Sequence, residues 1–417
     1  MKVAIVSPYP PSKGTLNEYA FHLVQNFKLK KEVKEIFILT DLIQQDYPEE
    51  LGVENCKVTI IPCWTFNSFK NALSIRKQIK KCGADIALFN IQFLSFGDNK
   101  LAGALGLLTP LLTRLSGVPC MTLLHNITET VDYKSAGITD SRVMMAIYNM
   151  IGTILTTLLL MSNMMAVTMP KYVRILERKY RVKNVALIPH GTFEVPDLPV
   201  ITQPKKMKVM TFGKFGTYKK VEEMIEAIEL IRSRTDLEME IIIAGTDNPN
   251  VKGYIQSVKD KYSHVRDLTF TGYVEEEDVP VLFSESTVVV FPYTSTTGSS
   301  GVLHQAGSYG KSVVLPNIGD LKELIEEEGY MGAYFQPGDV SGLADAIQKL
   351  LTDEAYRKEL EDTNYAAANA LPMSDIADWY LLHFQLLIGK NAHRSMQERT
   401  KPSTIRRPLA VELNSNY

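Results

Sequence analysis

The sequence predicts an α/β fold with two Rossmann-like domains, each a doubly wound parallel sheet, that face each other across a cleft. Short apolar runs alternate with segments of helical apolar spacing along most of the 417 residues, which is typical of β-α-β units. This alternation starts again after residue 200. Between the halves, Pro189, Pro196, Pro199 and Pro204 indicate a linker, because proline disrupts element interiors.

The expected strands are continuous apolar runs, which suits a parallel sheet whose strands are buried on both faces. In the first half they cover residues 3–7, 35–40, 58–62, 84–89, 119–124 and 164–168. The second half has such runs at residues 208–212, 239–244, 268–271, 287–291 and 312–315. Apolar spacing predicts helices over 18–27, 71–81, 101–115, 220–233, 251–261, 278–284, 301–309 and 342–351.

This pattern divides the chain into domains. We expect a first domain over residues 1–195, a second over 206–372 and a final helix over 373–389. Residues 390–417 are polar and basic and contain Pro402 and Pro408, so we expect a disordered tail there.

Residues 143–170 are 28 residues without a charge, which is long enough to span a bilayer. Asn149, Ser162, Asn163 and several threonines dilute the apolar character of this stretch. We therefore favour a buried helix followed by a core strand, with a membrane-spanning helix as the alternative. The apolar run before Pro8 is too short for the core of a secretory signal, so we expect no signal peptide.

Composition excludes several classes of protein. With 45% hydrophobic and 22% charged residues, the chain is not wholly disordered, collagen-like or a coiled coil. Its four cysteines include no Cys-X-X-Cys pair, which does not fit a disulfide scaffold or a zinc site. This cysteine usage suits a reducing compartment, and we expect a cytoplasmic protein.

Charge is distributed unevenly along the chain. Residues 1–200 contain 22 Lys and Arg against 16 Asp and Glu, whereas residues 201–389 contain 17 against 29. The basic first half could attract an anionic membrane at its inner face or a phosphorylated substrate, although ordinary variation between helix surfaces explains the same balance. The acidic second half argues against nucleic acid binding.

In doubly wound sheets, ligands bind outside the carboxyl ends of the strands, and several motifs stand there. Gly213 and Lys214, with Lys219 beyond them, follow the strand over 208–212, and their ammonium groups fit a diphosphate, with a solvated charge run as the alternative. A segment of small residues follows the strand over 287–291 and opens a helix, whose free amides would form an anion site. This segment contains Thr297, Gly298, Ser299, Ser300, Gly301, Val302 and Gln305.

Weaker candidates follow strands of the first half. Gly14 could let the backbone approach a phosphate or sugar, or it could be part of a plain strand–helix loop. His125 ends the strand over 119–124, and His190-Gly191 precedes the linker; a lone histidine is more often structural. We find no Gly-X-Ser-X-Gly elbow, no Walker-type phosphate loop and no Asp-X-Asp pair.

Four segments together resemble the GT-B glycosyltransferases of the retaining family-4 type, over roughly residues 1–388. Gly213-Lys214 with Lys219 is similar to that family's Gly-Arg/Lys…Lys element, and Phe270-Thr-Gly272-Tyr-Val to its Phe-X-Gly-X-Val segment. Gln305-Ala306 through Gly310-Lys-Ser-Val-Val resembles its Glu-Ala…Gly-X-Pro-Val-Val signature. The stretch that begins at Ser374 resembles the last helix, which in this fold crosses back onto the first domain.

The resemblance implies roles for these residues. Lys214 and Lys219 would hold the donor diphosphate, Gly14 would lie near it, and His125 would lie near the reacting sugar. The amides from Gly298 to Val302 would bind the transferred sugar and phosphate. The donor would be a nucleotide sugar, most often with UDP or GDP, and no metal or other cofactor is implied. The acceptor would be a glycan or a lipid-linked sugar, as in polysaccharide biosynthesis.

Some positions depart from the family pattern. Its two glutamates, spaced Glu-X7-Glu, are Thr297 and Gln305 here, so neither carboxylate is present. Lys214 replaces an arginine and loses the bidentate geometry on phosphate. Despite these departures, the resemblance leads us to expect a retaining, metal-independent glycosyltransferase. A protein of this fold that binds nucleotide or sugar without catalysis is the alternative, and an epimerase or a phosphorylase is a third.

Overall fold

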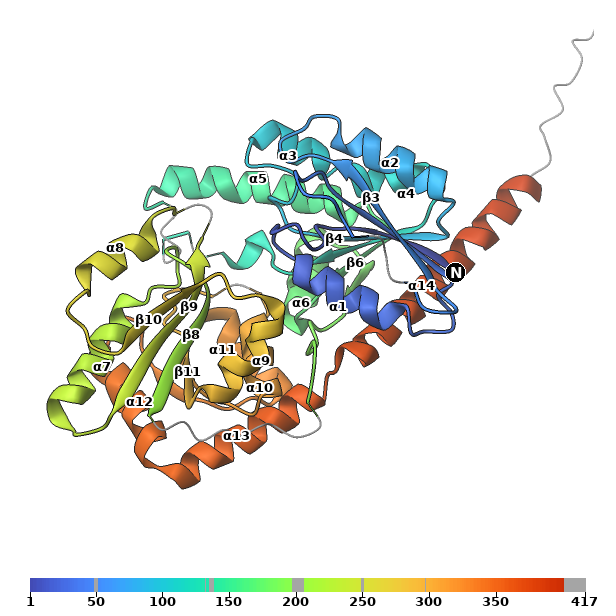
Figure 1. Cartoon of the computed structure of the whole chain (residues 1–417). Helices are drawn as coiled ribbons and strands as arrows, with labels where there is room; N and C mark the ends of the chain where they lie inside the picture. Colours follow the sequence, from blue (N-terminus) through green and yellow to red (C-terminus); the bar gives the residue numbers. More distant parts are fainter. Residues whose placement is uncertain are drawn as a thin grey trace, which may run out of the picture.

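The computed structural model describes residues 1–48, 52–131, 133–134, 139–196, 206–248, 251–296 and 298–400, with side chains described as far as residue 392. Two α/β units lie side by side, and a long helix runs from the second unit back along the first (Figure 1). The predicted fold class is confirmed, because each unit contains a parallel sheet with helices around it.

The first sheet has seven strands in the order β3-β2-β1-β4-β5-β6-β7, and every pair is parallel. The strands are β1 (Lys2–Val6), β2 (Glu35–Asp41), β3 (Lys57–Trp64), β4 (Ile86–Ile91), β5 (Cys120–Leu124), β6 (Met164–Val167) and β7 (Val185–Leu187). The helices are α1 (Asn17–Phe27), α2 (Asn71–Cys82), α3 (Lys100–Gly106), α4 (Thr109–Leu115), α5 (Arg142–Leu160) and α6 (Pro170–Tyr180). A short 3-10 helix, Thr128–Thr130, precedes α5.

The second sheet has six parallel strands in the order β10-β9-β8-β11-β12-β13. The strands are β8 (Met207–Phe215), β9 (Met239–Asp247), β10 (Leu268–Gly272), β11 (Val288–Val290), β12 (Ser312–Pro316) and β13 (Ala333–Phe335). The helices of this part are α7 (Glu222–Arg234), α8 (Tyr254–Lys261), α9 (Val279–Glu285), α10 (Gly301–Ser308), α11 (Gly319–Glu328), α12 (Val340–Thr352) and α13 (Glu354–Asn369). A 3-10 helix, Glu276–Asp278, precedes α9.

Both sheets have a topological switch point, where the strand order reverses beside the first strand. In the first sheet this point lies between β1 and β4, and in the second between β8 and β11. Loops that leave neighbouring strands in opposite directions open a crevice at such a point, and ligands bind there. The loops after β8 and β11 carry two of the motifs singled out from the sequence.

The last helix, α14 (Met373–Thr400), packs against α1 rather than against its own sheet. The Tyr19 hydroxyl lies 3.0 Å from that of Tyr380, and the ring of Phe27 contacts those of Tyr380 and Phe384. These side chains are fully buried, so α14 ties the two units together. The helix runs past residue 389, where we expected a disordered tail to begin, and residues 401–417 lie outside the described residues.

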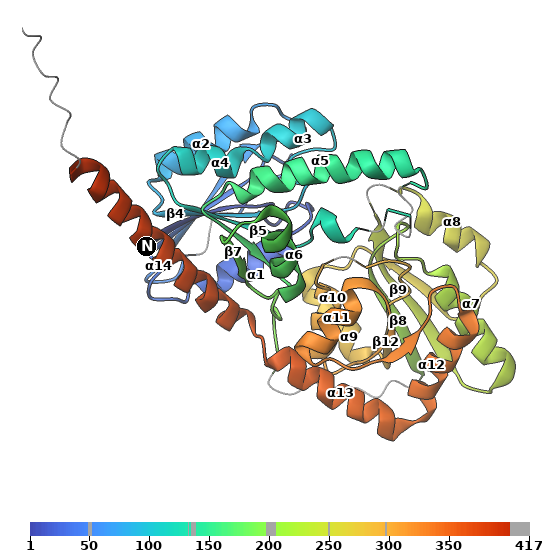
Figure 2. The same ribbon diagram turned by 180° about the vertical axis from the view of Figure 1, so that it is seen from behind.

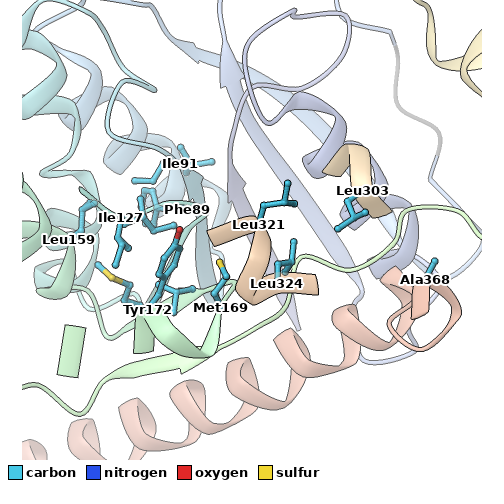
Figure 3. Packing of buried hydrophobic residues seen from close by; sticks show 14 of the residues in the cluster. Phe89, Ile91, Ile127, Leu159, Met169, Tyr172, Leu303, Leu321, Leu324 and Ala368 are labelled. Carbon is cyan, nitrogen blue, oxygen red and sulfur yellow. The ribbon is translucent and has the colours of Figure 1, made fainter. Parts of the chain in front are cut away.

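A second contact between the units is apolar. One cluster of buried side chains includes Phe89, Ile127 and Leu159 of the first unit together with Leu321 and Leu324 of the second. Figure 3 shows Tyr172 of α6 and Met169, which directly precedes this helix, between these two groups. The core is therefore continuous across the cleft.

The structure differs from the prediction in one expected helix and in several elements that were not expected. The helix over 101–115 is two helices, because Pro110 cannot donate within a helix and instead stands in the first turn of α4. The strands β7 and β13 and the helices α6, α11 and α13 were not predicted. The two strands have only three residues each, which is too short for a clear pattern.

The stretch from residue 143 was expected to be a buried helix followed by a core strand. The strand is present as the buried β6, whereas the expectation of a buried helix is wrong. The helix α5 is the one helix in the described residues long and apolar enough to span a membrane, yet only 22% of its most apolar window is buried. The helix is a crossover between β5 and β6, which pair directly with each other. One side of α5 packs against the 3-10 helix Thr128–Thr130, α4 and β6, while its other side is exposed.

Candidate donor site

A pocket lies at the switch point of the second sheet, between the loops that follow β8 and β11 and the start of α10. Its lining consists of Tyr218, Lys219, Tyr293, Thr296, Gly298, Ser299, Ser300, Gly301, Val302 and Leu321. Six of these residues were candidates from the sequence, namely Lys219, Gly298, Ser299, Ser300, Gly301 and Val302. The structure thus brings the two main motifs of the second half into one place.

Lys219 supplies a positive charge to this pocket. Its position is held by an antiparallel bridge between Lys219 and Tyr293, and the ammonium lies 4.7 Å from the centre of the Tyr293 ring. Gly213 makes room for it, since a Cβ at this position would lie 2.9 Å from the Lys219 Nζ atom and the glycine φ is 141°. The positive φ favours glycine at this position of the Gly-Lys motif, and the missing side chain leaves room for the ammonium of the second lysine.

The first turn of α10 supplies a second positive element. Gly301 and Val302 begin this helix, and their amides belong to the first turn, where no intrahelical acceptor exists. Ser300 precedes the helix, and its hydroxyl accepts a hydrogen bond from the Leu303 amide at 3.3 Å. An anion in the pocket would meet the helix N-terminus and the Lys219 ammonium together.

The Gly298 amide already donates hydrogen bonds within the protein. It donates to the Tyr172 hydroxyl at 2.6 Å and to the Asp320 carboxylate at 3.1 Å. Tyr172 in turn donates to Asp320 at 2.5 Å, and Lys171 forms an ion pair with the same carboxylate at 3.3 Å. Burial raises the pKa of Tyr172, and Asp320 raises it further, so the hydroxyl remains a donor. This network, which we call the interdomain network, joins α6 to α11 across the cleft.

His125 lies at the end of β5, beside the same loop. Its Nε2 donates to the Asn90 side-chain oxygen at 2.7 Å, and the Asn90 amide donates to the Ser7 hydroxyl at 2.9 Å. Burial lowers the pKa of His125 well below its ordinary value, and the nearby His190 lowers it further, so the imidazole is neutral. A Cβ on Gly298 would lie 2.6 Å from the His125 carbonyl oxygen, so the two chain segments touch.

Behind the pocket, further titratable groups are buried. The His190 and His304 rings are stacked, with centroids 5.1 Å apart, and the His304 Nδ1 atom lies 2.9 Å from the Tyr330 hydroxyl. Burial lowers the pKa of His304 well below its usual value and that of His190 to about 4. The neighbouring Glu328 carboxyl, 3.5 Å from His304, has its pKa raised by burial to about 8. This group is therefore uncharged at neutral pH.

The remaining predicted residues are placed differently. Lys214 is the second-last residue of β8 and lies outside the pocket lining. Burial and Glu276 raise the pKa of Glu18, and the nearby Lys214 opposes this rise. Gly14 lies in the loop after β1, where a Cβ would lie 2.8 Å from the Cβ of Pro8. Gln305 is buried on α10 beyond the pocket lining. Thr297 lies outside the described residues.

Sequence reasoning did not select several residues of the site. Tyr218, Tyr293 and Thr296 stand within the predicted motifs, and their position after a strand could have revealed them. Tyr172 and Asp320 are separated by 148 residues, and no spacing in the sequence connects them.

Comparison with known protein families gives a match to the second unit. Residues 206–353 match the family described as Glycosyl transferases group 1. The serotype-specific mannosyltransferase WbdA of Escherichia coli is 28% identical over 172 residues, which is 41% of this chain and 20% of that protein. The alpha-D-kanosaminyltransferase of Streptomyces kanamyceticus is 28% identical over 169 residues, 40% of each chain. The chain thus spans only a fifth to two fifths of these relatives' lengths.

Solved structures cover nearly the whole chain. Sucrose-phosphate synthase of Thermosynechococcus elongatus superposes with a TM-score of 0.70 at 19% identity, over 94% of this chain and all of that one. HepE of Anabaena, solved in complex with UDP and glucose, gives a TM-score of 0.64 at 14% identity, over 92% and 99%. The second unit therefore matches the model of the glycosyl transferases group 1 family over residues 206–353, and the chain as a whole has the GT-B fold.

Proposed function

We propose that this protein is a glycosyltransferase that moves a sugar from a nucleotide-diphosphate sugar to an acceptor hydroxyl, with retention of anomeric configuration and without a metal ion. The observation that supports it best is the pocket in which Lys219 and the first turn of α10 face one space. A diphosphate leaving group carries negative charge that grows as the glycosidic bond breaks. A fixed ammonium and a helix N-terminus stabilise that charge without reorganisation.

Several residues have roles in this proposal. Lys219 holds the donor diphosphate and Lys214 supports it from the end of β8. The Gly298 to Val302 segment binds the transferred sugar and its phosphate. His125 touches the loop at Gly298 through its backbone carbonyl, and its neutral imidazole is assigned to the reacting sugar by hydrogen bonding rather than by charge, although the ring lies outside the pocket lining. Gly14 lets the first domain close over the donor, while Thr297 and Gln305 complete the sugar and ribose contacts.

The donor and acceptor are proposed by class. UDP and GDP sugars are the favoured donors, since HepE is described with UDP and WbdA as a mannosyltransferase. The acceptor is a glycan or a lipid-linked sugar bound on the first domain, in the cytoplasm or at the inner face of a membrane. The basic balance of residues 1–200 supports contact with anionic lipid there.

The test is release of nucleoside diphosphate by the full chain from a panel of UDP and GDP sugars, with and without glycan and lipid-linked acceptors. We expect release that depends on the acceptor, persists in a chelator and retains the anomeric configuration, as followed by NMR. The Lys219→Ala variant should lose this release. Release that needs no acceptor would indicate a different reaction and contradict the proposal.

One observation favours a second candidate, a protein that binds nucleotide or sugar without transferring it. The Gly298 amide, which a bound donor needs, is held by Tyr172 and Asp320. If this network persists when ligand binds, the sugar cannot take its reactive position. Tight nucleotide binding with no turnover for any acceptor would support this candidate over the transferase.

A further inference from the structure

The outer face of α5 is a stripe of exposed aliphatic side chains. Val143, Ile147, Met150, Ile154 and Met161 follow one another at intervals of three, four or seven residues, so they lie on one side of the helix. Val143, Met150 and Ile154 are 70%, 58% and 54% exposed. In Figure 2 the helix lies lengthwise over the first domain, with its face toward the viewer uncovered.

The opposite side of α5 is fixed to the domain. Gly152, Thr156 and Leu159 are buried, and a Cβ on Gly152 would lie 2.6 Å from the Thr128 hydroxyl. The 19-residue helix, about 28 Å long, connects two strands that pair directly, and a spanning orientation would separate that pair. The geometry thus excludes a helix that crosses a membrane and favours one that lies along a surface.

The charges around the stripe are arranged along its length. Arg142 begins α5 and is exposed, Lys179 reaches the Thr153 hydroxyl at 3.0 Å, and Arg114 donates to the Met161 carbonyl at 2.8 Å. Residues 143–160 contain no charge of their own. Two carboxylates stand beside these basic residues or before the helix: that of Glu129, which is 4% exposed and paired with Lys179, and that of the exposed Asp140.

We propose that α5 is the membrane-docking surface of this protein, with its aliphatic stripe placed among the lipids of an anionic bilayer and its basic residues at the headgroups. Transfer of aliphatic side chains out of water is favourable in free energy, and the negative surface potential of the membrane attracts the surrounding cations. This proposal assigns a surface to the membrane contact considered above. It does not depend on the glycosyltransferase reaction, because docking requires no donor.

The test is co-sedimentation of the full chain with vesicles at low salt, without nucleotide. We expect binding to equimolar phosphatidylcholine and phosphatidylglycerol, weak binding to phosphatidylcholine alone, and release as salt rises. The variant Met150→Gln/Ile154→Gln should lose about tenfold or more in partitioning, because both side chains would no longer enter the lipid. Binding of UDP by this variant, measured separately, should be unchanged.

Two controls isolate the stripe. Val281 and Leu382, on α9 and α14, are 57% and 59% exposed, and Val281→Gln/Leu382→Gln should bind vesicles like the wild type. The variant Met150→Leu/Ile154→Leu keeps the apolar surface and should also bind. Equal binding by the Met150→Gln/Ile154→Gln variant, or no binding by the wild type, would overturn the proposal. So would a wild-type dimer that this variant makes monomeric, since the stripe would then be an interface between copies.

Discussion

Lys219 is the residue on which the donor pocket depends most. Its ammonium lies over Tyr293 and beside the first turn of α10, so it faces any anion that enters. We expect Lys219→Ala to weaken binding of a nucleoside diphosphate about tenfold or more, from the loss of a charged hydrogen bond. Titration calorimetry checks this value. Lys220→Ala, at the exposed neighbouring position, is the matched control and should bind normally.

Under the proposed function, Tyr172 competes with the donor for the Gly298 amide, to which its hydroxyl is hydrogen-bonded. In Tyr172→Phe this amide keeps Asp320 as its acceptor but loses the tyrosine hydroxyl. We expect nucleoside diphosphate to bind about two- to tenfold more tightly, while the free energy of unfolding falls by about 1–3 kcal/mol. Calorimetry and denaturant titration measure the two effects. Weaker binding would mean that Tyr172 supports the donor instead of blocking it.

Glu328 makes stability depend on pH. Its carboxyl is protonated in the folded state up to a pKa of about 8, whereas the unfolded chain releases this proton above about 4.5. The folded state therefore loses stability through this group as the pH rises from about 4.5 to about 8. Glu328→Gln removes this loss. We expect the free energy of unfolding of the variant to exceed that of the wild type by a few kcal/mol at pH about 9 and by little at pH about 5. Denaturant titration at both pH values tests this, and a constant difference would contradict it.

At the scale of the elements, α14 carries the strongest prediction. Phe384 is fully buried against α1, whereas Trp379 on the same helix is 41% exposed. We expect Phe384→Ala to lower the free energy of unfolding by about 3–5 kcal/mol, because a large buried ring leaves a cavity. Trp379→Ala is the control and should lower the free energy of unfolding much less. If both variants lost the same stability, the packing of α14 on α1 would not be the cause.

The elements also show what a sequence can reveal. Continuous apolar runs predicted most strands, because parallel strands are buried on both faces. The exposure of α5 could not be predicted, since the sequence pattern of an apolar helix is the same whether protein or lipid covers the helix. The division at Pro110 was predictable from proline chemistry but was missed.

At the scale of the whole molecule, the pocket lies at the switch point of the second sheet, where the loop at Gly298 touches the first unit at His125. Its place was predictable, because motifs that follow neighbouring parallel strands share one edge of the sheet. Lys219 and the residues from Gly298 to Val302 were found in this way, and they line one pocket. Lys214 and Gln305 lie in the same motifs but outside the pocket lining, since a motif places the backbone and not the side chain.

Contacts across the cleft could not be predicted from sequence. The hydrogen bond between Tyr172 and Asp320 joins residues from different domains, and nothing local to either residue signals it. The same is true of the His190 and His304 stack and of the contact between His22 and Glu276 at 3.2 Å. These contacts hold the first unit against the second beside the pocket.

The most direct test of this account is titration calorimetry of the full chain with UDP, GDP, ADP and dTDP in the absence of metal. The account predicts that one of these nucleotides binds, that its sugar binds as well, and that Lys219→Ala weakens both. Absence of binding to all four would show that a site with Thr297 and Gln305 in place of two glutamates no longer holds a donor, and it would contradict the proposed reaction.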